Sequence, residues 1–260
     1  MLITILLAAC GEYQSILKSK DPDYKYEKAL EYFNEGRYVR SQTLLEDVAS
    51  YFKGTERSED VLIYLSRSYM GQKDFASAAE YYQAYIRNYP KGKYIIEARF
   101  QVGHCYYLDS PDARLDQAVT QKSIKFFNEF VEYYPDSPYS EQAYREMNEM
   151  YDKLAYKEYL SAKLYYNLGS YLGNNYLSAE IVAQNALRDY PSNKYQEELS
   201  WIILQAKYQQ AVHSIPEKLA ERTRNTIDEY YNFTTEFPQS KHRSQADRIF
   251  NNMKKRKIED

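Results

Sequence analysis

The side chains able to carry catalytic or metal chemistry are few and scattered in this sequence. Its three histidines are far apart, and none has a second ligand three or four residues away within its predicted helix, as a helical zinc site requires. The zinc-protease, phosphate-loop and serine-hydrolase motifs are absent as well. Cys105 lies in an apolar helical stretch and is expected to be buried. We therefore expect no catalytic residue, no bound metal and no cofactor, and an enzyme is the least favoured class of function.

The overall composition excludes further classes of protein. The chain has 260 residues with only 8 Gly and 8 Pro, so a turn-rich all-β fold is not expected. Hydrophobic residues at 44% and charged residues at 27% are typical of a folded globular protein rather than a disordered one. The net charge of −3 provides no basic excess to neutralise a phosphate backbone, so we expect no nucleic-acid partner.

Cys10 is placed where a covalent modification is expected. It ends the short apolar run of residues 2–9, follows two alanines and precedes a glycine, so the segment 7–11 resembles the lipobox of bacterial lipoproteins. In such proteins the thiol is acylated with diacylglycerol, the signal is cleaved before the cysteine and the new N-terminus is acylated too. Two or more acyl chains hold a protein stably on a membrane. The alternative is an ordinary cysteine at a frayed terminus.

The expected boundaries follow from this modification site. We predict a signal segment over residues 1–9, a lipidated polar tether over 10–22, tetratricopeptide-like repeats over 23–256 and a tail over 257–260. A bare Met1 lacks the basic start of a signal peptide, so we expect the natural start to lie upstream. The apolar run is too short for a membrane-spanning helix, which needs ~20 residues. Fully extended, the tether would reach at most ~45 Å from the membrane.

The chain is punctuated by four pairs in which an aromatic residue precedes proline. These pairs are Tyr89-Pro90, Tyr134-Pro135, Tyr190-Pro191 and Phe237-Pro238. In each copy, the residues 12, 8 and 5 positions before the proline begin with a small one, and larger ones follow in three copies. The sets are Ala78, Tyr82, Tyr85; Ser123, Phe127, Phe130; Ala179, Ala183, Ala186; and Thr226, Tyr230, Phe233. This spacing places each set on one helical face, and proline ends each helix.

The same register defines a two-helix repeat. Residues 29–48 match residues 66–85 at a constant offset of 37, so a further copy exists near the N-terminus. Small residues, aromatics and a late proline in this order are typical of the tetratricopeptide repeat. We therefore predict an all-α fold, a tetratricopeptide-repeat superhelix of about five helix-turn-helix units. The alternative is a generic helical bundle whose prolines merely end helices.

Two further segments narrow the choice of family. Residues 114–117 lie in an insertion of the third repeat, and residues 152–159 lead into Ala162, Tyr165 and Tyr166. Together with the lipobox, the short tether, the five repeats and the length, these segments resemble the BamD/YfiO family, the lipoprotein subunit of the outer-membrane β-barrel assembly machine. The resemblance covers essentially the whole chain after the signal. An expanded turn at 173–176 departs from the family pattern.

The resemblance implies a non-enzymatic lipoprotein scaffold on the periplasmic face of the outer membrane of a Gram-negative bacterium. Its expected partners are the barrel-forming subunit (BamA-like), other assembly lipoproteins, unfolded β-barrel precursors and the membrane, reached through the lipid on Cys10. In the family, the C-terminal repeats dock the barrel subunit and the N-terminal repeats face substrate. Arg114, Asp116 and Gln117 are the expected partner contacts. Two alternatives are a periplasmic adaptor in envelope maintenance or cell division and, less favoured, a glycan-binding outer-membrane lipoprotein.

A peptide-binding groove is expected on the first helices of the N-terminal repeats. In tetratricopeptide geometry, positions 5, 9, 12 and 13 of each repeat line the concave face. The residues there are aromatic, apolar or polar, namely Tyr26, Phe33, Asn34, Ile63, Arg67, Met70, Phe100, His104 and Tyr107. An extended peptide could bury its side chains among them and place its carboxylate on Arg67. The alternative is that each of these residues packs against a neighbouring helix.

Overall fold

A computed structural model describes the backbone of residues 12–258 and the side chains of residues 12–256. The regular structure in this part of the chain is helical throughout, with no strand. The helices are α2 (Pro22–Asn34), α3 (Tyr38–Ala49), α4 (Arg57–Gly71), α5 (Phe75–Asn88), α6 (Ile95–Asp109), α7 (Ala118–Tyr133), α8 (Ser140–Leu168), α9 (Asn175–Asp189), α10 (Gln196–Val212), α11 (Pro216–Glu236) and α12 (Arg243–Ile258). The predicted all-α, tetratricopeptide-like fold is confirmed.

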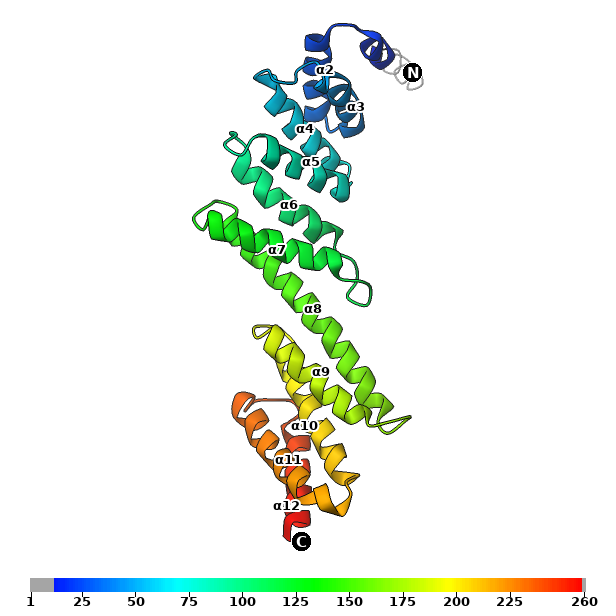
Figure 1. The fold of residues 1–260 in the computed structure, drawn as a ribbon, viewed down its shortest axis with the longest axis vertical. Helices are drawn as coiled ribbons and strands as arrows, with labels where there is room; N and C mark the ends of the chain where they lie inside the picture. The colour runs from blue at the N-terminus through cyan, green and yellow to red at the C-terminus, as the bar shows by residue number, and fades with distance from the viewer. Residues whose placement is uncertain (1–11, 259–260) are drawn as a thin grey trace, which may run out of the picture. The chain divides into compact units, whose positions relative to one another are not determined.

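The helices belong to two compact units. The first contains the chain up to Pro111 together with Asp116–Met150, and the second contains Asp112–Leu115 together with Tyr151–Asp260. Consecutive helices pack as antiparallel hairpins in each unit, with α2–α3, α4–α5 and α6–α7 in the first (Figure 1). The second unit holds α9 to α12, where α10 packs against both α9 and α11. The 29-residue helix α8 contributes to both units.

The aromatic-proline pairs end helices as predicted. The aromatic residue of each pair is the C-cap of α5, α7, α9 or α11, with φ between −122° and −135° and ψ between 61° and 67°. Each C-cap N–H still donates to the carbonyl four residues earlier, as Tyr89 does to Tyr85. The following proline has no N–H to extend this ladder, so the helix stops at the same point in every copy.

The residues found at fixed distances before each proline form part of the buried core. All twelve residues of the four sets are buried, with the exposed fraction no higher than the 7% of Tyr230. On α6, Gly103 lies so close to this buried face of α7 that a Cβ atom would be 2.7 Å from a ring carbon of Phe127. The Ser123 hydroxyl donates to the Gly103 carbonyl at 3.0 Å. Cys105 is fully buried beside this contact, as predicted.

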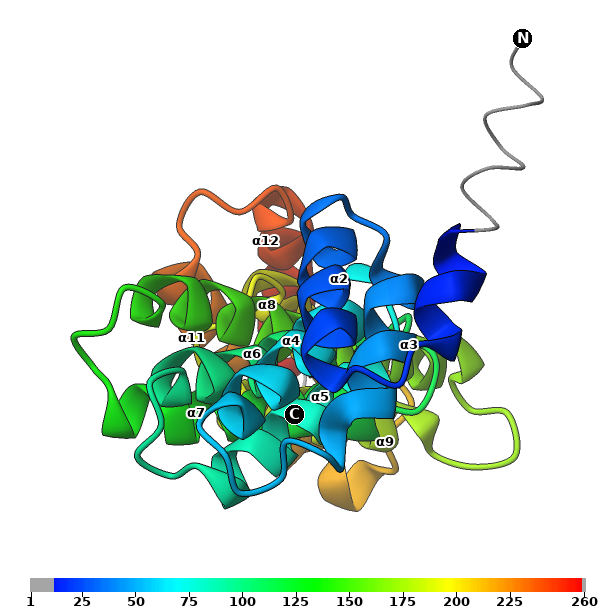
Figure 2. The ribbon, with the colours of Figure 1, turned by 90° about the horizontal axis from the view of Figure 1, so that it is seen from above.

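The structure differs from the predicted tether, because residues 12–18 form a helix that packs on the first hairpin (Figure 2). Tyr13, Ile16 and Leu17 have the i, i+3, i+4 spacing of an apolar helical face. Ile16 is only 1% exposed and lies in the core cluster of α2 and α3. The ring of Tyr13 contacts that of Tyr32 edge-on at 5.6 Å. Part of the predicted tether over 10–22 is therefore helical, and Cys10 lies outside the described part of the chain.

Substituting Gly103 tests the packing of α6 against α7. In an exposed helix, Gly→Ala is stabilising by up to about 1 kcal/mol. At Gly103 we expect the opposite sign, because the added methyl group meets the Phe127 ring. Gly103→Ala should lower the free energy of unfolding by about 1–3 kcal/mol, measured by urea denaturation. The double variant Gly103→Ala with Phe127→Leu should recover part of the loss. An unchanged or raised stability of Gly103→Ala would contradict the close approach.

Candidate functional site

The nine residues predicted to line a groove divide into buried and partly exposed ones. Tyr26, Ile63 and Phe100 are 8%, 0% and 2% exposed. Tyr26 packs edge-on against Phe52 of the α3–α4 turn, Ile63 belongs to the core cluster of α4 to α6, and Phe100 contacts the rings of Phe127 and Phe130 on α7. These three are therefore packing residues, because their side chains are already covered. The partly exposed remainder is named here the first-helix face: Phe33, Asn34, Arg67, Met70, His104 and Tyr107.

Arg67 on the first-helix face already binds a carboxylate. Its guanidinium makes two parallel hydrogen bonds to Glu97 of α6, at 2.8 and 2.6 Å. The rings of Tyr64 and Tyr94 lie 5.3 and 4.9 Å from the guanidinium carbon. The hydrogen bonds to Glu97 raise the pKa of Arg67 further above its usual value. The free side chain that we expected for a peptide carboxylate is thus occupied by a residue of the same chain.

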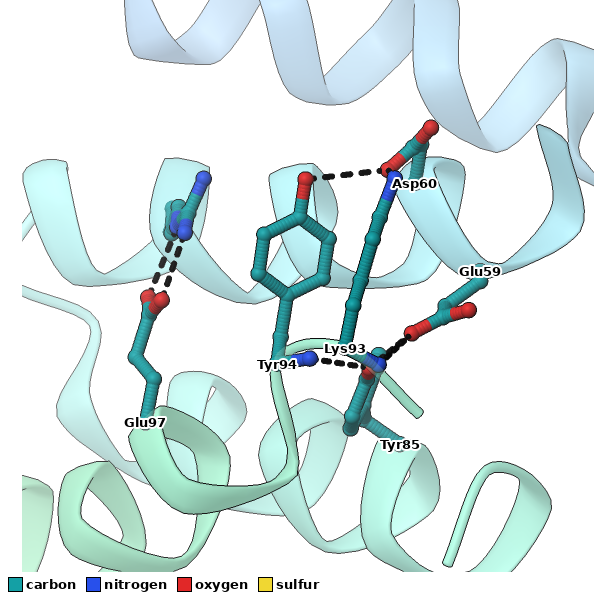
Figure 3. Close-up of polar contacts among 7 residues, drawn as sticks. Glu59, Asp60, Tyr85, Lys93, Tyr94 and Glu97 are labelled. Carbon is teal, nitrogen blue, oxygen red and sulfur yellow. Dashed lines mark hydrogen bonds and ion pairs between the residues drawn. The ribbon is translucent and has the colours of Figure 1, made fainter. Parts of the chain in front are cut away.

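Beside this pair, a polar network joins α4 to the turn between α5 and α6 (Figure 3). Lys93 forms an ion pair with Asp60 at 2.7 Å, and the Tyr94 hydroxyl donates to the same carboxylate at 3.1 Å. Glu59 accepts hydrogen bonds from the Tyr85 hydroxyl and, at 2.7 Å, from the backbone N–H of Lys93. Two neighbouring carboxylates at the start of α4 therefore bind both side chains and backbone of the turn.

The charged and neutral forms that this network needs are the ones present at neutral pH. The hydrogen bond to Asp60 raises the pKa of Lys93, so the ammonium group stays protonated at neutral pH. Burial, and then the hydrogen bond to Glu59, raises the pKa of Tyr85. A raised tyrosine pKa adds stability that is present below the ordinary value of about 10 and is lost as the pH rises through the raised one. The network is therefore intact across the physiological range.

A similar contact recurs in other hairpins, and we call it the turn clasp: an ion pair between a cation in or just after the turn that ends a hairpin and a carboxylate on that hairpin's first helix. Lys194 pairs with Asp152 at 2.8 Å, and its N–H donates to the same carboxylate at 2.9 Å. Lys241 pairs with Glu198. Arg57 pairs with Asp23 at the end of the first hairpin. The third hairpin has proline at the corresponding position, Pro138, and uses a stacked ring instead.

In the clasps of Lys194 and Lys241, the residue after the cation stacks on a ring of the same first helix. Tyr195 lies against the ring of Tyr156 at 5.0 Å, and His242 lies parallel to Trp201 at 4.7 Å. In the third hairpin, Tyr139 stacks on Phe100 at 4.8 Å. Neither the stacked rings nor the acidic partners of these turns were predicted from the sequence. The lysine three residues after the proline in three of the four copies was the signal that could have revealed them.

On α6, His104 and Tyr107 of the first-helix face contact side chains of α8. His104 Nδ1 lies 2.7 Å from Glu146 Oε2, and the Tyr107 hydroxyl donates to Glu149 at 2.6 Å. This hydrogen bond, followed by burial, raises the pKa of Tyr107 to about 12. Both acceptors lie on α8 within the first unit. Arg67, His104 and Tyr107 of the first-helix face are thus each in contact with a carboxylate of the same chain.

The three predicted partner contacts do not share one environment. Arg114 is exposed in the insertion between α6 and α7, and Asp116 accepts a hydrogen bond from the Ala118 N–H at 2.9 Å. Gln117 is only 5% exposed and accepts from the Thr120 hydroxyl. Its side chain therefore helps to fix the start of α7, and only Arg114 and Asp116 are available at the surface.

The described residues offer no site for catalysis by a metal. Among them, no group of three or more His, Cys, Asp or Glu side chains is placed to hold a metal ion. No helix in the same part of the chain combines the length and the apolar character needed to cross a membrane.

Comparison with known proteins adds one match. A family model described as YfiO, outer membrane lipoprotein, matches residues 18–173. This range includes the first-helix face, the turn after α5 and the insertion before α7. No curated protein matches the chain.

The pairing of Arg67 with Glu97 can be measured as a coupling energy. The two side chains are 25% and 19% exposed, so their bidentate contact is partly shielded from water. A double-mutant cycle with Arg67→Met and Glu97→Gln, followed by urea denaturation, should give a coupling of about 1–2 kcal/mol. The pair Arg145–Glu141 on α8 is the matched control, because its side chains are 60% and 88% exposed. Its coupling should stay below about 0.5 kcal/mol. Equal couplings for the two pairs would refute the shielding.

Proposed function

The chain belongs to the YfiO family of outer membrane lipoproteins, and from this membership we propose that it is a non-enzymatic scaffold of the β-barrel assembly machine. The predicted resemblance is confirmed by the family match. Association with the outer membrane and with its assembly components in general follows from the family. The finer proposal has three parts: a lipid anchor at Cys10 on the periplasmic face, a docking surface for the barrel-forming subunit, and a face that receives unfolded β-barrel precursors.

A cluster of exposed apolar side chains at the junction of α8 and α9 supports the docking surface. These residues, which we call the apolar ridge, are Leu164, Tyr165, Leu168, Tyr171, Leu172, Leu177 and Ile181. On α8 and α9, leucine and isoleucine recur four residues apart, so each helix presents them on one face. Groups of exposed apolar residues of this kind mark interaction sites in soluble proteins. The ridge lies in the second unit, which agrees with a C-terminal docking surface.

Leu172 is the single residue that carries this part of the proposal. It is 91% exposed and adopts a φ of +55°, in the left-handed region. That conformation costs a non-glycine residue roughly 1–2 kcal/mol. Hydrogen bonds close the turn around it, from the Asn175 N–H to the Gly169 carbonyl at 3.0 Å and from the Asn175 amide to the Tyr171 carbonyl at 2.7 Å. The free chain therefore holds an apolar side chain in water in a strained conformation, which favours a partner that covers it.

The turn itself is shorter than the sequence suggested. We expected an expanded turn at 173–176, but Asn174 is the N-cap of α9 and Asn175 begins the helix. The Asn174 side chain accepts a hydrogen bond from the Leu177 N–H at 3.3 Å. Helix capping by asparagine explains why the two residues after it are helical.

Replacing Leu172 should separate partner binding from stability. Asparagine tolerates the left-handed conformation, so Leu172→Asn should leave the free energy of unfolding unchanged or raise it by up to about 1 kcal/mol. The recovery of the barrel-forming subunit with the detergent-solubilised, lipidated protein should fall at least tenfold. Val39→Asn on α3 is the control, because Val39 is 62% exposed but lies outside the ridge. Equal recovery with wild type and Leu172→Asn would refute the docking surface.

The same co-purification tests the proposed function as a whole. Wild-type protein should bring down the barrel-forming subunit as its major partner. Recovery of a glycan-import porin, or of envelope-maintenance or cell-division proteins without any barrel-assembly subunit, would contradict the proposal.

For the precursors, we propose the first-helix face as the receiving surface. The occupied state of Arg67 changes how a peptide would bind there. A terminal carboxylate must displace or share the Glu97 carboxylate, which lies 2.6 Å from the guanidinium. Phe33, Met70 and Tyr107 flank this position with partly exposed apolar surface on α2, α4 and α6. The face would then bind a peptide by exchange of one ion pair for another, so the net electrostatic gain is small and the apolar contacts decide the affinity.

This exchange predicts opposite effects for the two members of the pair. With a β-barrel C-terminal peptide as the probe, Glu97→Gln should raise the affinity about three- to tenfold, because Arg67 loses its internal competitor. Arg67→Gln should lower the affinity by a similar factor. Fluorescence anisotropy with a labelled peptide measures both, and an amidated peptide without the carboxylate is the control. A decrease in affinity with Glu97→Gln would show that the carboxylate does not bind Arg67.

A further inference from the structure

A cavity of about 300 Å³ lies between α5, α6 and α7 in the first unit. Its apolar lining consists of Ile86, Phe126 and Phe130, and two arginines, Arg87 and Arg99, also line it. None of these residues belongs to the first-helix face or the apolar ridge. The volume is at the lower end of the range found for ligand sites, and roughly 150 Å³ is enough to hold a benzene ring.

Arg99 has a buried hydrogen-bond donor without an acceptor. Its Nε atom is buried and has no hydrogen-bond partner among the described residues. The guanidinium carbon lies 5.3 Å from the centre of the Tyr133 ring, so the aromatic face orients the side chain. A buried donor without an acceptor destabilises the folded chain. Arg99 also lines the cavity, so a carboxylate that enters it can accept charge-assisted hydrogen bonds from the guanidinium.

The charges around the cavity are not balanced within the chain. No ion pair joins Arg87 or Arg99 to a carboxylate in the part of the chain that the structure describes, whereas Arg57 and Arg67 in the same unit are both paired. The acidic residue of the lining, Glu129, lies 3.9 Å from Lys125 on its own helix. The cavity thus has two positive side chains for one carboxylate that already faces a lysine. Its charge favours an anionic ligand.

We propose that this cavity, the α5–α7 pocket, binds the acidic side chain of a partner polypeptide together with an adjacent aromatic or aliphatic side chain. The carboxylate accepts hydrogen bonds from Arg99 and faces Arg87, while the apolar neighbour packs on Phe126 and Ile86. An inorganic anion would satisfy the arginines but leave the apolar lining in water, so the combination of both features favours a peptide. This site goes beyond the proposed function and does not depend on it, since no residue of the lining takes part in the surfaces described above.

Blocked peptides test this assignment directly. The probes are acetylated and amidated tetrapeptides that carry one Asp or Glu flanked by Phe or Leu, so that only the side chain supplies a carboxylate. The full chain should bind such peptides, and replacing Asp by Asn or Glu by Gln should weaken binding at least tenfold. Arg99→Met should weaken binding of the acidic peptides at least tenfold and should leave binding of the amide versions unchanged. Isothermal titration calorimetry measures each affinity.

Two controls separate binding from folding. Arg99→Met should unfold at the same temperature as wild type or a higher one, because it removes an unsatisfied buried donor. Arg145→Met, which removes an exposed arginine of α8, should bind the acidic peptides like wild type. Equal affinity of acidic and amide peptides, or of wild type and Arg99→Met, would overturn the proposal. The proposal would also be overturned if no peptide bound at millimolar concentration, or if sulfate bound and no peptide did.

Discussion

The hairpins of this protein depend on one constraint: the turn that ends each hairpin must be held against that hairpin's first helix. The proline at four of these turns stops the second helix and leaves backbone N–H groups near the start of the next helix without helical partners. A carboxylate on the first helix can hold the turn in place and also accept a hydrogen bond from its backbone. Asp152 does both, because it pairs with the Lys194 side chain and accepts from the Lys194 N–H. The turn is therefore held by residues far apart in sequence, and in several hairpins a stacked ring completes the contact.

This constraint has a consequence for the surface on which a ligand would act. Carboxylates of the same chain already contact two polar side chains of the first-helix face, because Glu97 binds Arg67 and Glu146 lies 2.7 Å from His104. A partner on this face replaces internal contacts one for one. By contrast, the cavity between α5 and α7 holds arginines without an ion pair among the described residues, and the apolar ridge holds side chains that remain exposed. Which charged and polar side chains are already paired within the chain thus determines which surfaces are left for other molecules.

Most of the fold could be predicted from the sequence, because its signals are local. The small and aromatic residues at fixed distances from each proline identify the buried face of α5, α7, α9 and α11, and all of them lie in the core. The contacts of individual side chains could not be predicted in the same way. Whether Arg67 is free depends on Glu97, 30 residues later, and Leu172 gains its left-handed conformation from a turn closed by Asn175. The helix over residues 12–18 was missed because polar residues surround its short apolar face.

The stacking of His242 on the single tryptophan, Trp201, gives this chain an optical property of its own. A ring stacked on an indole affects the fluorescence of the indole, and separation of the two rings changes the emission. Since both residues lie in the second unit, the tryptophan emission reports the closure of one turn on α10 in that unit. Rearrangement of this turn on assembly can therefore be followed in real time, in the native protein, without any attached dye.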